Sequence, residues 1–355
     1  MKRFAALFLV LMLSLTCLAG CGNSYSVEAD SVENVILFIG DGMGENHLKN
    51  TLTYFEMAEP SFMADKCGSI ATRSSNRLVT DSAAAATAMA TGQKVKNGEI
   101  SQHRGEDIQT IVELAKRAGK KVGIITTDHL DGATPAAFSA HAADRGDRED
   151  IARSQAVSGV DLFIGEAESD YSYYNDFHSL FEENGYTFVT SETDLNANKK
   201  KAKLVATLPE VRSEYNSGNS DDYQLDEMVK FAMTFLENDN GYFLMVESAH
   251  IDKFSHDNQI VPALCEVRSM IDAITYVYGE ISESPVTALI VTADHETGKL
   301  ELAESKADIA NKLYKSEGHT SRDVPVYSKN AKITFNGTLQ NTVIFDICNL
   351  LLLGN

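Results

Sequence analysis

The stretch Val35-Ile36-Leu37-Phe38-Ile39-Gly40-Asp41-Gly42 decides the fold of this 355-residue chain. An unbroken apolar run is typical of a strand that is buried on both faces, as in a parallel sheet covered by helices. The run ends in Gly-Asp-Gly, which predicts a loop directly after the strand. We therefore expect a buried strand that places Asp41 at the edge of a sheet.

The same arrangement, a helix followed by an apolar strand, recurs further along the chain. Helices are expected over 106–118, 225–236 and 262–281, and apolar strands follow them at 122–125, 242–246 and 288–291. Repeated units of this kind predict an α/β fold with a mostly parallel central sheet and helices on both faces. The polar segment 170–222 has weak periodicity, so we expect it to be a surface excursion rather than a second domain.

The composition limits the class of function. The chain has 51 acidic and 31 basic side chains, a formal charge of −20, and 43% hydrophobic residues. The apolar share excludes an intrinsically disordered protein. The acidity argues against a nucleic-acid partner, because binding to a phosphate backbone depends on Lys and Arg. A phosphate-bearing substrate would need a local source of positive charge.

Residues 1–20 are expected to be an export signal, with a basic start and an apolar run shorter than the ~20 residues that span a bilayer. The ending Leu18-Ala19-Gly20-Cys21 resembles the bacterial lipobox, which implies a lipid on Cys21. A plain signal peptide with an incidental cysteine is the alternative. We expect a lipidated tether over 21–33 and a single catalytic domain over 34–355.

Cysteine chemistry is not expected to carry the function. Cys67, Cys265 and Cys348 remain beyond the signal, and none has the Cys-x-x-Cys spacing of a thiolate metal site. We interpret them as small core residues, with one disulfide left open.

A helix is predicted to begin at Asp81-Ser82, because a long alanine-rich run follows these residues. One interpretation is that Ser82 or Asp81 only caps this helix. The other is that the Ser82 hydroxyl lies where the backbone N–H groups and the helix dipole favour an anion such as phosphate.

Acidic and imidazole side chains gather at the predicted strand ends. Asp252 and His256 are four residues apart, a spacing that puts both on one side of a helical turn. The other candidates are Asp41, Glu247, Asp294, His295 and His319. Carboxylates and histidines without cysteine indicate a site for zinc and hard divalent cations. Two such ions can hold the attacking and leaving oxygens of a displacement at phosphorus.

Seven short strings resemble the alkaline phosphatase family and occur in that family's order. They are Phe38-Ile39-Gly40-Asp41-Gly42-Met43-Gly44, Thr80-Asp81-Ser82-Ala83, Ala133-Thr134-Pro135-Ala136, Met245-Val246-Glu247, Ile251-Asp252-x-x-x-His256, Thr292-Ala293-Asp294-His295 and Gly318-His319-Thr320. Each string is weak alone, but seven in order are specific.

The resemblance implies that Ser82 is a nucleophile that becomes phosphorylated and that Arg145 binds phosphate. It implies two zinc ions and one magnesium ion. One zinc would be bound by Asp252, His256 and His319, the other by Asp41, Asp294 and His295, and magnesium by Asp41, Thr134 and Glu247.

Two positions near the magnesium site need comment. The family has Asp or His two residues before Thr134, but this chain has Gly132. Either Asp131 replaces that group or the third site is weaker and filled by solvent. Lys253 matches family members in which a lysine contacts phosphate through water, and a solvated surface lysine is the alternative.

The remaining histidines have no partner at ligand spacing in these motifs, so we expect structural or surface roles for them. They are His47, His103, His129, His141, His178 and His250, of which His250 lies inside the metal-binding string. The stretch between His295 and His319 is too short for the crown-like subdomain of larger family members. The crown-based dimer contacts of those members are not expected, and a homodimer is left open.

The resemblance therefore predicts an exported hydrolase of small phosphate monoesters, held at the outer side of a bacterial membrane by the lipid on Cys21. A phosphodiesterase or sulfatase on the same metal scaffold is the nearest alternative. A lipoprotein that binds phosphate or metal without catalysis is a third, which has no need for Ser82 at a two-metal centre.

Overall fold

The computed structural model describes residues 15–18, 23–167, 174–209, 211–218, 223–309 and 313–354. Its centre is a ten-stranded sheet in the order β17-β4-β15-β12-β3-β11-β7-β8-β10-β9. The strands in that order are Leu339–Gln340, Lys66–Ala71, Val324–Lys329, Thr287–Ala293, Asn34–Gly40, Tyr242–Ser248, Lys121–Thr126, Leu162–Glu166, Leu204–Leu208 and Thr187–Val189. All neighbouring pairs from β12 to β9 are parallel, whereas β15 runs antiparallel to β12 and β4. The predicted mostly parallel sheet is confirmed.

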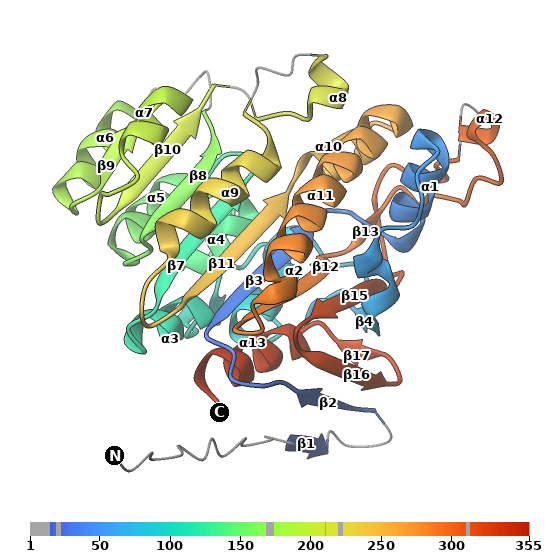
Figure 1. Ribbon diagram of the computed structural model, residues 1–355, viewed down its shortest axis with the longest axis horizontal. Helices are drawn as coiled ribbons and strands as arrows, with labels where there is room; N and C mark the ends of the chain where they lie inside the picture. The colour runs from blue at the N-terminus through green and yellow to red at the C-terminus, as the bar shows by residue number, and fades with distance from the viewer. Residues whose placement is uncertain are drawn as a thin grey trace, which may run out of the picture.

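The strand predicted at 35–39 is β3, which lies in the middle of this sheet. Residues 35–40 are all buried, because β12 and β11 flank the strand and helices cover both faces. In Figure 1, α9 and α11 lie in front of the sheet, and α3 and α13 lie behind it. The bounds are Leu225–Leu236 for α9, Ile260–Glu280 for α11, Ile111–Arg117 for α3 and Val343–Leu353 for α13.

Helix α3 begins later than the predicted 106–118, because Thr110 caps it together with Glu113. The preceding residues form a short hairpin of β5 (Gln102–His103) and β6 (Glu106–Asp107). The other helices are α1 Glu45–Phe55, α2 Ser82–Thr91, α4 Ala133–Ser139, α5 Arg148–Val157, α10 His250–His256 and α12 Lys306–Ile309, with 3₁₀ turns at Ser61–Asp65 and Ile281–Glu283.

The segment expected to be a surface excursion contributes two strands to the central sheet, so that prediction was wrong. Strands β10 and β9 extend the sheet beyond β8, and every residue of β10 is buried. Leu204-Val205-Ala206-Thr207-Leu208 is apolar enough to pair with β8 although a lysine-rich stretch precedes it. Near these strands lie α6 (Tyr174–Glu183) and α7 (Glu192–Ala197), whereas α8 (Glu214–Ser217) packs against α11.

The predicted tether is in part a strand. Residues Ser24–Glu28 form β2, which pairs antiparallel with β16 (Lys332–Asn336) and with β1 (Leu15–Leu18). Val27 is buried, so this part of the chain packs on the domain instead of extending from it. Residues 1–14 and 19–20 of the predicted signal lie outside the described residues, and so do residues 21–22 of the predicted tether, which include the proposed lipid site at Cys21.

Cys265 and Cys348 are buried and Cys67 is half-buried, and all three thiols are free. In the part of the chain that the structure covers, no helix combines the length and apolar character that crossing a membrane would require.

Candidate active site and metal clusters

The carboxyl ends of three adjacent strands bring the predicted ligands to one edge of the sheet. Asp41 follows β3, Asp294 follows β12, and Glu247 lies near the end of β11. Because these strands are parallel neighbours, their ends meet at the same edge, where ligands bind in sheets of this kind.

Asp41, Asp294 and His295 form an inner cluster. His295 Nε2 lies 3.2 Å from Asp294 Oδ2 and 3.5 Å from Asp41 Oδ1. Neither of these two carboxylate oxygens has a hydrogen-bond partner among the described residues. Burial and repulsion from Asp294 raise the pKa of Asp41 well above its usual value, and burial raises the pKa of Asp294 to about 6. Burial lowers the pKa of His295. A cation is the missing partner of such a group.

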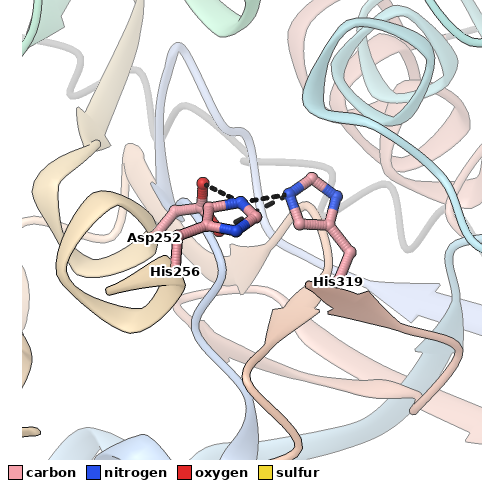
Figure 2. A group of neighbouring side chains, drawn as sticks. All are labelled: Asp252, His256 and His319. Atoms are coloured by element: carbon pink, nitrogen blue, oxygen red, sulfur yellow. Dashed lines mark hydrogen bonds and ion pairs between the residues drawn. The ribbon is translucent and has the colours of Figure 1, made fainter. Parts of the chain in front are cut away.

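Asp252, His256 and His319 form an outer cluster, in which the three side chains point toward one another (Figure 2). His256 Nε2 lies 3.2 Å from Asp252 Oδ2 and 3.0 Å from His319 Nε2. Burial raises the pKa of Asp252, but hydrogen bonds to the two imidazoles outweigh it and hold that pKa well below its usual value. The hydrogen bond to Asp252 raises the pKa of His256 to about 9.

Each of these imidazoles directs its Nε2 into a cluster, because its Nδ1 binds an oxygen behind it. His256 Nδ1 contacts the carbonyl of Glu317, and His319 Nδ1 lies 2.9 Å from the carbonyl of Thr80. His295 Nδ1 lies 3.3 Å from the Thr297 hydroxyl. A hydrogen bond from Nδ1–H fixes the tautomer that leaves a lone pair on Nε2, the usual arrangement of a metal-binding histidine.

Thr297 and Gly42 hold the two clusters together. The Thr297 hydroxyl donates to Asp252 and also contacts His295, so it links both clusters. Gly42 has a φ of +73°, and a Cβ there would lie 2.8 Å from Asp252 Oδ1. Its backbone N–H donates to Asp294 Oδ1 at 3.0 Å. Only glycine fits both the left-handed backbone and this close approach.

Ser82 is the first residue of α2 and is 4% exposed. Asp81 is the cap of this helix, because its Oδ1 accepts from the Ala84 N–H at 3.0 Å. The Ser82 hydroxyl is therefore not needed as a cap and lies 3.3 Å from His295 Nε2. Of the two interpretations of this segment, the structure gives the capping role to Asp81.

Arg145 lies at the rim beside Ser82. Its Nη1 is 3.5 Å from Asp81 Oδ2, and 43% of the side chain is exposed. An exposed guanidinium next to a helix N-terminus can bind an incoming anion.

Glu247 and Thr134 lie next to the inner cluster. Burial raises the pKa of Glu247 to about 8, although a hydrogen bond from Thr126 opposes the shift. Repulsion from Glu247 contributes to the raised pKa of Asp41, which places these two carboxylates near each other. The Thr134 hydroxyl is buried beside Glu247 and makes no regular hydrogen bond in the described part of the chain, but its interaction with Glu247 opposes the rise in the pKa of that carboxyl. Oxygen donors alone suit a hard cation such as Mg²⁺.

Comparison with known proteins places this arrangement in a family. The alkaline phosphatase family model matches residues 32–166 and 166–307. The chain belongs to the alkaline phosphatase family. His319 lies beyond the matched ranges, so its position is known here from the fold.

The chain resembles curated alkaline phosphatases in sequence and a solved alkaline phosphatase in structure. The chain is 32% identical to alkaline phosphatase 4 of Bacillus subtilis over 288 residues, 75% of this chain and 62% of that protein. It is 33% identical to an alkaline phosphatase of Schizosaccharomyces pombe over 75% of this chain and 56% of that protein. The chain thus spans less than two thirds of these relatives. The alkaline phosphatase of the Antarctic bacterium TAB5 superposes with a TM-score of 0.80, at 30% identity over 91% of this chain and 98% of that structure.

Two residues that the sequence places near the family's magnesium site make other contacts. Asp131 receives hydrogen bonds from Arg148 Nε and Nη2, at 2.7 and 2.8 Å, so its carboxylate is held on that guanidinium instead of replacing the group missing at Gly132. Lys253 Nζ binds Asp128 Oδ1, and 48% of its side chain is exposed, so this lysine is ion-paired and also open to solvent.

The sequence analysis missed several residues near the site. Thr297 closely follows Asp294-His295, and its hydroxyl could have been recognised as a neighbour of His295. Asp128, His129 and Glu166 form a third group with ligand atoms within 4.8 Å of one another, although His129 is expected from the sequence to be structural or at the surface. Glu166 ends β8 in the same way that Glu247 lies at the end of β11, and this signal could have indicated the third group.

Proposed function

We propose that this chain hydrolyses phosphate monoesters through a phosphoserine formed on Ser82. The observation that carries the proposal is the position of the segment 80–82 between the clusters. The carbonyl of Thr80 contacts His319 of the outer cluster, and the Ser82 hydroxyl contacts His295 of the inner cluster. A nucleophile next to both metal clusters is what a two-ion displacement at phosphorus requires.

The inner and outer clusters fit two zinc ions. The buried oxygens Asp41 Oδ1 and Asp294 Oδ2 lack partners among the described residues, and the imidazoles direct Nε2 toward the carboxylates. The inner zinc would be bound by Asp41, Asp294 and His295, the outer by Asp252, His256 and His319. Bound zinc would lower the pKa of a nearby hydroxyl and stabilise the charge that develops on the leaving oxygen.

The chain's own residues bind and attack the ester. Arg145 binds two phosphate oxygens, and the N-terminus of α2 adds backbone N–H groups beside them. The Ser82 hydroxyl gives its proton to solvent, and its oxygen forms a bond to phosphorus as the ester P–O bond breaks, so that the alcohol leaves with a proton from solvent. Water then attacks phosphorus and the Ser82–phosphate bond breaks, which releases phosphate carrying the water oxygen and returns a proton to the Ser82 oxygen.

We assign magnesium to Asp41, Thr134 and Glu247, on the evidence of the buried Thr134 hydroxyl beside Glu247 and the raised pKa of Glu247. A histidine-to-glutamate variant of the TAB5 enzyme holds magnesium in a site called M3, which supports such a site in this fold. Because Asp131 binds Arg148, this third site would be completed by solvent.

We also propose export and a lipid anchor on Cys21, from the lipobox-like ending of the N-terminal segment. Incorporation of labelled palmitate into the wild-type protein, and its loss in Cys21→Ala, is the expected result. Equal labelling of both proteins would contradict the anchor. Light scattering of the purified protein gives its molar mass in solution and tests for a homodimer.

Turnover of p-nitrophenyl phosphate at alkaline pH tests the main proposal, with bis-p-nitrophenyl phosphate and p-nitrophenyl sulfate as rivals. We expect the monoester to be the best substrate, and both Ser82→Ala and exhaustive chelation to abolish turnover. Faster turnover of the diester or the sulfate would favour the alternative enzymes. Stoichiometric phosphate binding without turnover would favour a binding lipoprotein. Full activity of Ser82→Ala would overturn the mechanism.

A further inference from the structure

A second group of ligand-type side chains lies one strand further along the same sheet edge. Asp128 and His129 follow β7, Glu166 ends β8, and His250 begins α10. Strands β7 and β8 are parallel neighbours, so their carboxyl ends meet. None of these four residues belongs to the proposed phosphatase centre.

The distances in this group match those of the two proposed zinc clusters. His250 Nε2 lies 3.4 Å from Glu166 Oε2, and His129 Nε2 lies 3.7 Å from Asp128 Oδ1. The corresponding imidazole–carboxylate distances in the inner and outer clusters are 3.2, 3.5, 3.2 and 3.6 Å. Two ligands bound to one zinc ion at a tetrahedral angle are about 3.3 Å apart. These spacings are those of ligands around an ion.

The orientation of the imidazoles also resembles that of metal ligands. His129 Nδ1 lies 3.3 Å from the carbonyl of Glu166, so an Nδ1–H donated to that carbonyl leaves the Nε2 lone pair toward Asp128. The same carbonyl-bound Nδ1 occurs in His256 and His319. His250 is 3% exposed, and its Nδ1 has no hydrogen-bond partner within the described residues. The other nitrogen of this buried imidazole, Nε2, faces Glu166 and holds that carboxylate in position.

The backbone holds the group in place. The Glu166 N–H donates to the Asp128 carbonyl at 2.8 Å, and the Asp128 N–H donates to the Thr126 hydroxyl at 3.0 Å. A Cβ at Gly165 would lie 2.8 Å from the Asp128 carbonyl, so the two segments are in close contact. The ligands are therefore preorganised, and the partly exposed side chains of Asp128 and His129 leave a path for an ion.

We propose that Asp128, His129 and Glu166 bind one further divalent transition-metal ion, with zinc as the expected metal and His250 as the residue that positions Glu166. One imidazole with two carboxylates suits an ion of the zinc class better than magnesium or calcium, which favour oxygen donors alone. The ammonium of Lys253 contacts Asp128, so an entering ion competes with this lysine. The site does not depend on the proposed catalytic mechanism.

The test is the zinc content of the purified protein after dialysis against a zinc-buffered solution. The double variant His129→Gln/Glu166→Gln should lose about one zinc ion per chain relative to wild type, because two ligands of one site are removed. The matched control is Glu113→Gln/His141→Gln. His141 has the same carbonyl-bound Nδ1, with Nε2 3.2 Å from Glu113, but no third ligand in the described residues. The control should keep the wild-type zinc content.

Circular dichroism and the p-nitrophenyl phosphate assay show whether each variant folds, and Glu166→Gln alone serves where the double variant does not. In crystals, anomalous scattering at the zinc edge should give a peak among Asp128, His129 and Glu166 that is absent from the variant. Equal zinc content in wild type and variant, or an equal loss in the control, would overturn the site. Failure of the phosphatase proposal would appear as absent turnover with this zinc difference intact.

Discussion

The inner and outer clusters contain the same residue types, yet their side chains differ in charge state: burial favours neutral groups in the inner cluster, and an ion pair forms in the outer one. The His295 and Asp294 side chains are fully buried, whereas 41% of the His256 side chain is exposed. Inside, burial favours the neutral forms of Asp294 and His295. Outside, His256 and Asp252 stabilise each other as an ion pair. The outer cluster can persist without a metal, whereas the inner cluster holds two buried carboxylate oxygens that have no hydrogen-bond partner among the described residues, so it depends more on a cation.

The difference between the two clusters is tested most strongly by removing one ligand from each of them in turn. Asp294→Asn should lower kcat/KM for p-nitrophenyl phosphate by ~10³-fold or more, since about 4 kcal/mol of charge stabilisation is lost with the inner zinc. His256→Gln should cost less, about 10- to 100-fold, because water can fill an exposed position and excess zinc can restore occupancy. Assays with increasing zinc measure both. A larger loss in His256→Gln that zinc does not restore would reverse the comparison.

Chelation should separate the clusters by their effect on stability. Removal of metal with EDTA should lower the Tm of the wild-type protein by about 8 °C, if bound ions contribute ~4 kcal/mol at a thousandfold excess over Kd. In Asp294→Asn the fall should be smaller, because one buried charge no longer needs a cation. Differential scanning calorimetry with and without EDTA gives both values. An equal fall in the two proteins would show that the inner cluster is not the metal-dependent one.

Lowering the pH should reduce the stability of the folded protein through His47, which contacts the helix of the outer cluster. His47 Nε2 lies 3.1 Å from the Ser255 hydroxyl on α10, and burial lowers the pKa of His47 to about 3. The unfolded chain binds this proton near pH 6.5 and the folded protein does not. The stabilisation is therefore complete above about pH 6.5 and declines by ~1.4 kcal/mol per pH unit as the pH falls toward 3.

Urea unfolding at several pH values between 6.5 and 4 measures this slope. His47→Gln should flatten it by about one proton relative to wild type, whatever its effect on absolute stability. His103→Gln is a control in which a histidine outside the cluster is removed in the same way. An unchanged slope in His47→Gln would show that His47 is already protonated in the folded protein.

The sequence predicted the centre of the sheet because strands such as β3 and β12 are continuous apolar runs. It predicted the strand-end acids because parallel strands end at one edge. It could not show that Arg148 binds Asp131, because that contact depends on where α5 lies. Nor could it show that Asp128 meets Glu166, since only the pairing of β7 with β8 brings them together. Strands β9 and β10 were missed because charged and amide side chains surround them in the sequence.

The smallest expected effect comes from Thr297, the hydroxyl that touches both clusters. Thr297→Val keeps the shape of the side chain but removes the donor to Asp252 and the acceptor for His295 Nδ1. Loss of such a supporting contact typically lowers metal affinity 10- to 100-fold. Because His295 has no alternative Nδ1 partner recorded in the described structure, whereas Asp252 keeps its two imidazoles, the inner zinc should weaken more than the outer. Titration with a competing chelator should show one zinc ion released earlier than in wild type.

Ser248→Ala, which removes a buried hydroxyl that has no hydrogen-bond partner among the described residues, is the control that should leave both affinities unchanged. Equal weakening of both zinc ions would mean that Thr297 serves the clusters alike, and that burial alone makes the inner one different.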